Sequence, residues 1–114
     1  MNSETLTALL GSIEKWEAIV AGITVDQGPK NCPLCWSFYS RRRSCSGCPV
    51  SERSGQILCR GTPYQVYATL DELPTSERAR LAATNEVKFL RSLLPPDHPD
   101  YAEYVQSVAE KLPV

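Results

Sequence analysis

Apolar residues recur at intervals of three and four along residues 3–21, which is the spacing of one face of an α-helix. Ser3 is a candidate N-cap, and Gly22 is a candidate end before the helix-breaking sequence DQGPKN. We expect Trp16 to pack in the core against the cysteine-rich segment that follows. The apolar positions are Leu6, Leu9, Leu10, Ile13, Trp16, Ile19 and Val20, and Ile23 continues the pattern.

A second helical pattern covers residues 75–94, with Thr75 or Ser76 as its N-cap and Pro95 as its stop. We interpret Glu77 and Glu86, as well as Asp100 further on, as charges on helix surfaces. The apolar positions of this pattern are Leu81, Ala83, Val87, Leu90, Leu93 and Leu94.

Two shorter helices are predicted. One runs from Pro63 to about Leu70, where Thr62 and Gln65 match a capping box and Pro74 marks the end. The other covers residues 99–112, and His98 precedes it in a turn where helix capping is its expected role. No strand pattern longer than a few residues and no internal repeat is visible.

Residues 31–61 show little periodicity and are rich in Ser, Gly and Pro, so we expect a loop-dominated segment. The sequence as a whole predicts a mainly α-helical single domain over residues 1–114. About four helices carry a loop-rich metal module that is inserted after the first of them. The parts of this domain are an N-terminal helix within 1–24, the metal module at 30–62 and C-terminal helices within 63–114.

Two Cys-x-x-Cys pairs, Cys32 with Cys35 and Cys45 with Cys48, are separated by nine residues. Each pair can form a tight turn that directs both thiolates to one ion, and four thiolates match the tetrahedral preference of zinc. Too few large apolar residues lie here for the segment to fold without a metal or neighbouring helices. The spacing therefore predicts a structural zinc site, and four protein ligands would leave no open position for catalysis.

Alternatives remain for these cysteines. Four thiolates also suit an iron–sulfur cluster, although the spacing differs from the compact ferredoxin run. Disulfides are the other alternative, but five cysteines without a recognisable signal peptide point to a reducing compartment, where thiols remain reduced. Cys59 is either a substitute for one of the four ligands or a buried thiol, and a reactive thiol beside Arg60 with a redox role is the less favoured third alternative.

Charge is distributed unevenly along a chain of ordinary composition, with 42% hydrophobic and 22% charged residues. Six basic residues and one acidic residue lie between Lys30 and Arg60, a net charge of +5, which leaves −6 for the rest of a chain whose total is −1. A zinc ion on four thiolates would lower the central segment to about +3. Such a molecule presents a positive face, but it is no general binder of polyanions.

Aromatic residues and arginines lie between the two cysteine pairs, as in surfaces that hold single-stranded nucleic acid. Zinc modules also use such aromatics as a small core, and arginines dock on acidic protein surfaces. We favour a protein partner over DNA or RNA, because no base-reading helix at finger spacing follows the pairs. The candidate partner-binding residues are Trp36, Tyr39, Arg41, Arg42 and Arg43.

Catalysis and membrane insertion are not expected. The single histidine, His98, lies between prolines, and no Ser/His/Asp set, phosphate-binding glycine loop or paired carboxylate motif is present in the sequence. The apolar runs are too short to span a membrane, and the N-terminus lacks the basic region of a signal peptide. We therefore expect a cytoplasmic protein that is not an enzyme.

The order of motifs W…NCPLC…CSGCPV…CRGTPY, followed by FLRSLLP, resembles small cysteine-rich proteins of tailed phages and prophages of Proteobacteria. The similarity runs from Trp16 to about Pro95 and does not include the arginine run. It implies life in the cytoplasm of an infected bacterium and a structural role for Cys59. It suggests a phage-encoded binding protein that inhibits or redirects a host protein, such as an anti-CRISPR or other anti-defence factor. The alternative is a small zinc-containing DNA- or RNA-binding regulator.

Overall fold

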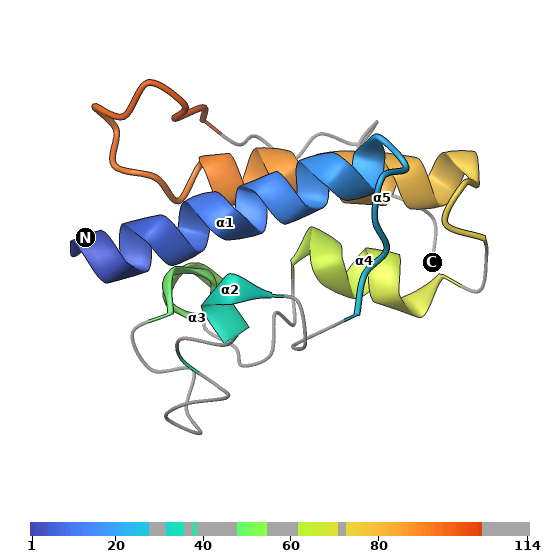
Figure 1. The fold of residues 1–114 in the computed structure, drawn as a ribbon, viewed down its shortest axis with the longest axis horizontal. Helices are drawn as coiled ribbons and strands as arrows, with labels where there is room; N and C mark the ends of the chain where they lie inside the picture. The colour runs from blue at the N-terminus through green and yellow to red at the C-terminus, as the bar shows by residue number, and fades with distance from the viewer. Residues whose placement is uncertain (28–31, 36–37, 39–47, 55–61, 71–72, 104–114) are drawn as a thin grey trace.

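The computed structural model describes residues 1–27, 32–35, 38, 48–54, 62–70 and 73–103. These residues form helices and connecting turns without a strand, which confirms the prediction of a mainly α-helical protein. The helices are α1 (Ser3–Val20), α2 (Pro33–Cys35), α3 (Pro49–Ser54), α4 (Pro63–Thr69) and α5 (Glu77–Arg91). The two long helices, α1 and α5, pack together and run in opposite directions, while α4 packs on α5 and α2 packs on α1 (Figure 1).

Helix α1 covers nearly the residues predicted for it, but its N-cap lies one residue earlier than expected. The Asn2 side chain accepts a hydrogen bond from the Thr5 amide at 2.7 Å, so Asn2 is the N-cap, and the prediction of Ser3 was wrong. At the other end Gly22 has a φ of 77°, and its amide donates to the Ile19 carbonyl. The next amide, of Ile23, donates to Ala18. This pair of bonds is a Schellman motif, so the predicted end at Gly22 is confirmed.

Helix α5 is capped by Ser76, whose hydroxyl accepts a hydrogen bond from the Ala79 amide at 3.1 Å. It ends at Arg91, well before the prolines that were expected to stop it. Leu93 and Leu94 are nevertheless buried, because turn hydrogen bonds from their amides keep the chain coiling beyond the helix. The apolar pattern therefore extended farther than the helix itself.

Helix α4 confirms the third predicted helix, with Pro63 at its first position and its end at Thr69, one residue before the predicted Leu70. Thr62 occupies the N-cap position without making a side-chain capping hydrogen bond, so that half of the predicted capping box was wrong.

The predicted last helix differs at its start. Residues 99–103 are not helical, and residues 104–112 lie outside the described part of the chain. His98 lies in a turn as expected, and its Nδ1 accepts a hydrogen bond from the Asp100 amide at 3.0 Å. It therefore stabilises a turn in place of a helix end.

The cysteine-rich segment contains two short helices that the sequence analysis assigned to loops. Both α2 and α3 begin at a proline that directly follows a cysteine, Pro33 after Cys32 and Pro49 after Cys48. Proline favours the first helical position because its φ is already suitable and its missing N–H would have no partner there. The signal was present in the sequence, but the segment's low periodicity concealed it.

One apolar core joins the two long helices to the cysteine-rich segment. Trp16 is buried, and its ring makes edge-on contacts with Tyr64 and Tyr67 of α4, at centroid distances of 5.5 and 5.1 Å. The predicted core role of Trp16 is confirmed, with α4 supplying these aromatic partners. Ile23, which continued the apolar pattern of α1, is 80% exposed and lies outside the core. The segment supplies Leu34, Phe38, Cys48 and Val50 to the core.

None of the helices in the described ranges combines the length and the apolar character needed to cross a membrane.

Candidate functional site

The predicted zinc ligands are only partly within the described residues. The side chain of Cys32 is half-buried at the start of α2, and that of Cys48 is buried just before α3. Cys35 is the last residue of α2, but its side chain lies outside the described part, as do Cys45 and Cys59. Among the described side chains, no group of three or more His, Cys, Asp or Glu residues could hold a metal ion. The four-cysteine site therefore stays a prediction.

The predicted partner-binding residues Trp36, Tyr39 and Arg41 to Arg43 also lie outside the described part. What the structure does place are the residues on either side of the arginines. Phe38 and Cys48 are both buried and belong to the same core. The nine residues 39–47 thus connect two fixed points on the scaffold.

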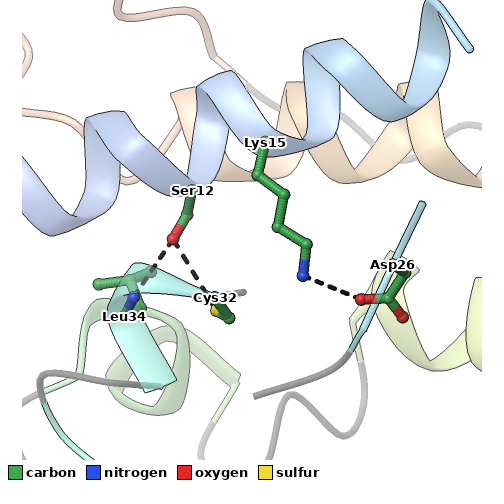
Figure 2. Close-up of polar contacts among 5 residues, drawn as sticks. All are labelled: Ser12, Lys15, Asp26, Cys32 and Leu34. Atoms are coloured by element: carbon green, nitrogen blue, oxygen red, sulfur yellow. Dashed lines mark hydrogen bonds and ion pairs between the residues drawn. The ribbon is translucent and has the colours of Figure 1, made fainter. Parts of the chain in front are cut away.

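Helix α1 holds the first cysteine through Ser12, which is only 2% exposed. The Leu34 amide donates a hydrogen bond to Ser12 Oγ at 3.4 Å, and the Cys32 Sγ lies 3.9 Å from the same oxygen (Figure 2). Gly11 permits this close approach, since a Cβ at that position would lie 3.0 Å from Pro33 Cγ. This explains a glycine in the middle of a long helix, where it otherwise costs about 1 kcal/mol relative to alanine.

A partly buried ion pair lies one helical turn further along α1. Lys15 Nζ donates to Asp26 Oδ1 at 2.9 Å, and the two side chains are 7% and 15% exposed (Figure 2). Lys15 Nζ also lies 5.2 Å from the centroid of the Trp16 ring, within the range of a cation–π contact. The chain reversal at Gly22 brings Asp26 back toward α1, so this pair depends on the end of that helix.

Glu86 was predicted to be a surface charge, and that prediction was wrong, because it is only 3% exposed. The backbone amide of Tyr64, in the first turn of α4, donates a hydrogen bond to its carboxylate. Glu86 therefore caps α4 from another helix, in the role that the Thr62 side chain does not take. Its other oxygen, Oε1, is buried and has no hydrogen-bond partner among the described residues.

The electrostatic surroundings of Glu86 link α5 to the first cysteine. Burial raises the pKa of Glu86 to about 8, and the negative charge of the Cys32 sulfur contributes in the same direction. Lys15 and the Tyr64 amide oppose this rise, while Asp26 adds to it. Burial and Asp26 together also raise the pKa of Tyr67. We call the group of Ser12, Lys15, Asp26, Cys32 and Glu86 the polar cluster.

The sequence contained a signal for the buried position of Glu86. Ala79, Ala82, Ala83, Glu86 and Leu90 follow the three-and-four spacing of a helix face, and all of them are buried. The predicted apolar positions included Ala83 and Leu90 from this face but not Ala79 or Ala82.

No protein-family model matches the chain, and neither a curated protein nor a solved structure matches it significantly. The fold and the polar cluster therefore rest on the residues of this chain alone, and the phage resemblance stays a prediction.

Thiolates are ordinary zinc ligands, and two of the predicted ones, Cys32 and Cys48, border the same apolar core. Within the described residues, they and the carboxylates of the polar cluster form no group of three or more donors that could hold a metal ion.

Proposed function

We propose that this chain is a zinc-stabilised, non-catalytic binding protein that presents Arg41, Arg42 and Arg43 to a protein partner. The observation that carries the proposal is the burial of Phe38 and Cys48 in one core with α1 and α5. A binding segment that is attached at both ends loses less conformational entropy when it meets its partner than a chain with one loose end.

Zinc would be held by Cys32, Cys35, Cys45 and Cys48, with Cys59 as the substitute ligand. When bound, the ion supplies a cross-link between the two ends of the cysteine-rich segment and neutralises part of the thiolate charge. Ser12 supports this arrangement from α1, since it contacts Cys32 and accepts a hydrogen bond from Leu34.

The proposed partner is an acidic surface of a bacterial host protein. Arginine forms bidentate hydrogen bonds with carboxylates, and three arginines in succession suit a cluster of them. The remainder of the chain carries a charge of −6 and would repel a nucleic-acid backbone near the arginines, which favours a protein over DNA or RNA. The phage resemblance suggests that the first function to test is that of an anti-defence factor, such as an anti-CRISPR protein.

A comparison of two variants tests the arginine surface. The R41Q/R42Q/R43Q variant removes three positive charges from the segment, and an R78Q/R80Q/K88Q variant removes three from exposed positions of α5. Tagged proteins would be used to capture partners from a bacterial lysate, and the same variants would be expressed in a CRISPR-immune bacterium that is challenged with phage. We expect the wild type and the α5 variant to enrich one partner and to protect the phage. The R41Q/R42Q/R43Q variant should neither enrich that partner nor protect the phage. Equal enrichment by all three proteins would contradict the proposed surface.

Two further measurements separate the proposal from its alternatives. Elemental mass spectrometry of protein purified under reducing conditions should find one zinc per chain, whereas iron with visible absorbance would indicate an iron–sulfur cluster. In gel shifts with random duplex and single-stranded DNA, we expect no binding at physiological salt. Tight binding that weakens steeply with salt would replace the proposal with a nucleic-acid regulator.

A further inference from the structure

An open pocket of about 400 Å³ lies where the segment that follows α1 passes α4 (Figure 1). Its volume lies within the range of about 300–1,000 Å³ that is typical of ligand pockets. The pocket has no part in the predicted zinc site or in the arginine surface, so the proposed function does not account for it. The residues that line it include Val25, Asp26, Tyr64, Tyr67, Leu70 and Pro74.

Contacts with α1 hold the walls of this pocket in place. Tyr64 and Tyr67 pack edge-on against the buried Trp16, at centroid distances of 5.5 and 5.1 Å. Asp26 is held by Lys15, whose Nζ donates to its Oδ1 at 2.9 Å. Because these walls are fixed in the free protein, binding requires little further ordering of them, which lowers its entropic cost.

Exposed apolar side chains gather on the two segments that form the pocket. Of the four large apolar residues that are exposed in the described part of the chain, three lie there, namely Ile23, Val25 and Leu73. Val25 lines the pocket, and Leu73 directly precedes Pro74, which also lines it. Exposed apolar residues around a pocket indicate a protein contact, and tyrosine is enriched in such contacts. The pocket and its rim therefore have the character of a docking surface.

Charge indicates the chemistry of the occupant. Asp26 is the one charged residue among the described residues that line the pocket, and the chain outside residues 30–60 carries a net charge of −6. The faces of tyrosine rings also attract cations. A basic segment is therefore attracted, whereas a second copy of this acidic region, an anionic lipid surface and a nucleic acid are repelled. Residues 104–114 contain one Glu and one Lys, so charge does not favour them as the occupant.

We propose that this pocket binds an apolar side chain from a basic segment of a partner protein. The apolar side chain contacts Val25, Leu70 and Pro74, while neighbouring lysines or arginines of the partner lie near Asp26 and the tyrosine rings. The proposal requires neither zinc nor residues 41–43, so its test is independent of the proposed function. It gives the acidic part of the chain a contact surface whose charge is opposite to that of the arginine surface.

A synthetic peptide with leucine and lysine at helical spacing is a suitable probe, because it presents apolar and basic side chains together. Two matched peptides carry glutamate in place of lysine, or serine in place of leucine. Binding of each fluorescent peptide to the full chain would be measured by anisotropy at physiological salt for wild type, Val25→Lys and Thr7→Lys. Both substitutions add one positive charge at an exposed position, but Thr7 lies in the first half of α1 and does not line the pocket.

We expect the leucine–lysine peptide to bind wild type and Thr7→Lys with similar affinity, and to bind Val25→Lys at least about tenfold more weakly. Each matched peptide should bind the wild type at least about tenfold more weakly than the leucine–lysine peptide does. In amide NMR spectra of the wild type, the leucine–lysine peptide should shift the signals of Val25, Tyr67 and Leu70. This mapping tests the proposal even if Val25→Lys does not fold.

Three results would overturn the proposal: equal binding of the three peptides, signal shifts confined to other residues, or no binding of the leucine–lysine peptide. A dimer of the free protein that Val25→Lys dissociates would also overturn it, since a second copy would then occupy the pocket. Light scattering of both proteins would detect such a dimer.

Discussion

The apolar core and the polar cluster are built on the same two helices, but different forces hold them together. In the core, Leu9 and Ile13 of α1 and Leu90 of α5 are removed from water, and the stabilisation grows with the buried area. In the polar cluster, Glu86 is buried and Lys15 is partly buried, so stability depends on the groups that balance the charge of each side chain. The contribution of the apolar core to stability should therefore be independent of pH and metal, whereas the contribution of the polar cluster should depend on both.

The largest effect is expected from truncation in the apolar core. Leu9 has no exposed surface, and Leu9→Ala should lower the free energy of unfolding by about 3–4 kcal/mol through lost burial and a residual cavity. Urea denaturation at pH 6 and pH 8 should give the same loss at both values. Leu73→Ala is the control, since Leu73 is largely exposed and its truncation should change little. If the loss of unfolding free energy in Leu9→Ala varied with pH, the apolar core would not differ from the polar cluster in the way we describe.

Breaking the partly buried ion pair should rank next. Lys15→Met leaves Asp26 without its 2.9 Å partner, and we expect a loss of about 3 kcal/mol that is nearly independent of salt. The comparison is Glu17→Gln, which breaks the Arg91–Glu17 pair at 2.8 Å, where the Glu17 side chain is 48% exposed. That exposed pair should contribute less than about 1 kcal/mol and weaken with salt. Similar losses for the two variants would show that burial does not distinguish the pairs.

The pH dependence of stability should depend on Glu86. In metal-free protein its pKa of about 8 lies above the ordinary value of 4.5, so the folded state keeps a proton that the unfolded state releases. Stability should therefore fall as the pH rises through this window, by roughly 2 kcal/mol between pH 5.5 and 7. Denaturant titrations of chelator-treated wild type and Glu86→Gln would measure it, and the variant should lose most of this slope. An equally steep decline in the variant would assign the effect to another group.

The smallest effect concerns the contact between α1 and the first cysteine. Ser12→Ala removes the acceptor for the Leu34 amide and the neighbour of Cys32, with an expected loss of about 1 kcal/mol. It should also raise the rate at which Cys32 is alkylated, which peptide mass spectrometry can follow. Ser3→Ala is the matched control, because Ser3 is exposed and Asn2 caps the helix. A cost for Ser3→Ala as large as that for Ser12→Ala would show that the Ser12 contacts contribute nothing specific.

Local patterns predicted the long helices well because their apolar spacing and caps lie within a few neighbouring residues. Ser76 caps α5 and Gly22 ends α1 as expected. The failures came from contacts between distant residues. Thr62 matched a capping motif, but the carboxylate of Glu86, more than twenty residues away, accepts the hydrogen bond in the first turn of α4. The spacing of small residues along α5 is consistent with a buried Glu86, but it does not show that the Tyr64 amide is its hydrogen-bond donor. The contact between Lys15 and Asp26 likewise depends on a chain reversal after α1.

That reversal has a consequence for the order in which the protein folds. Because Gly22 turns the chain back, Lys15 and Asp26 are only eleven residues apart when they meet, and closing so short a loop costs little entropy. Glu86 must instead find Tyr64 and Cys32 across much longer stretches of chain. We therefore expect the first helix and the segment that returns to Asp26 to form early. The contacts of Glu86 should form late and affect the rate of unfolding more than the rate of folding.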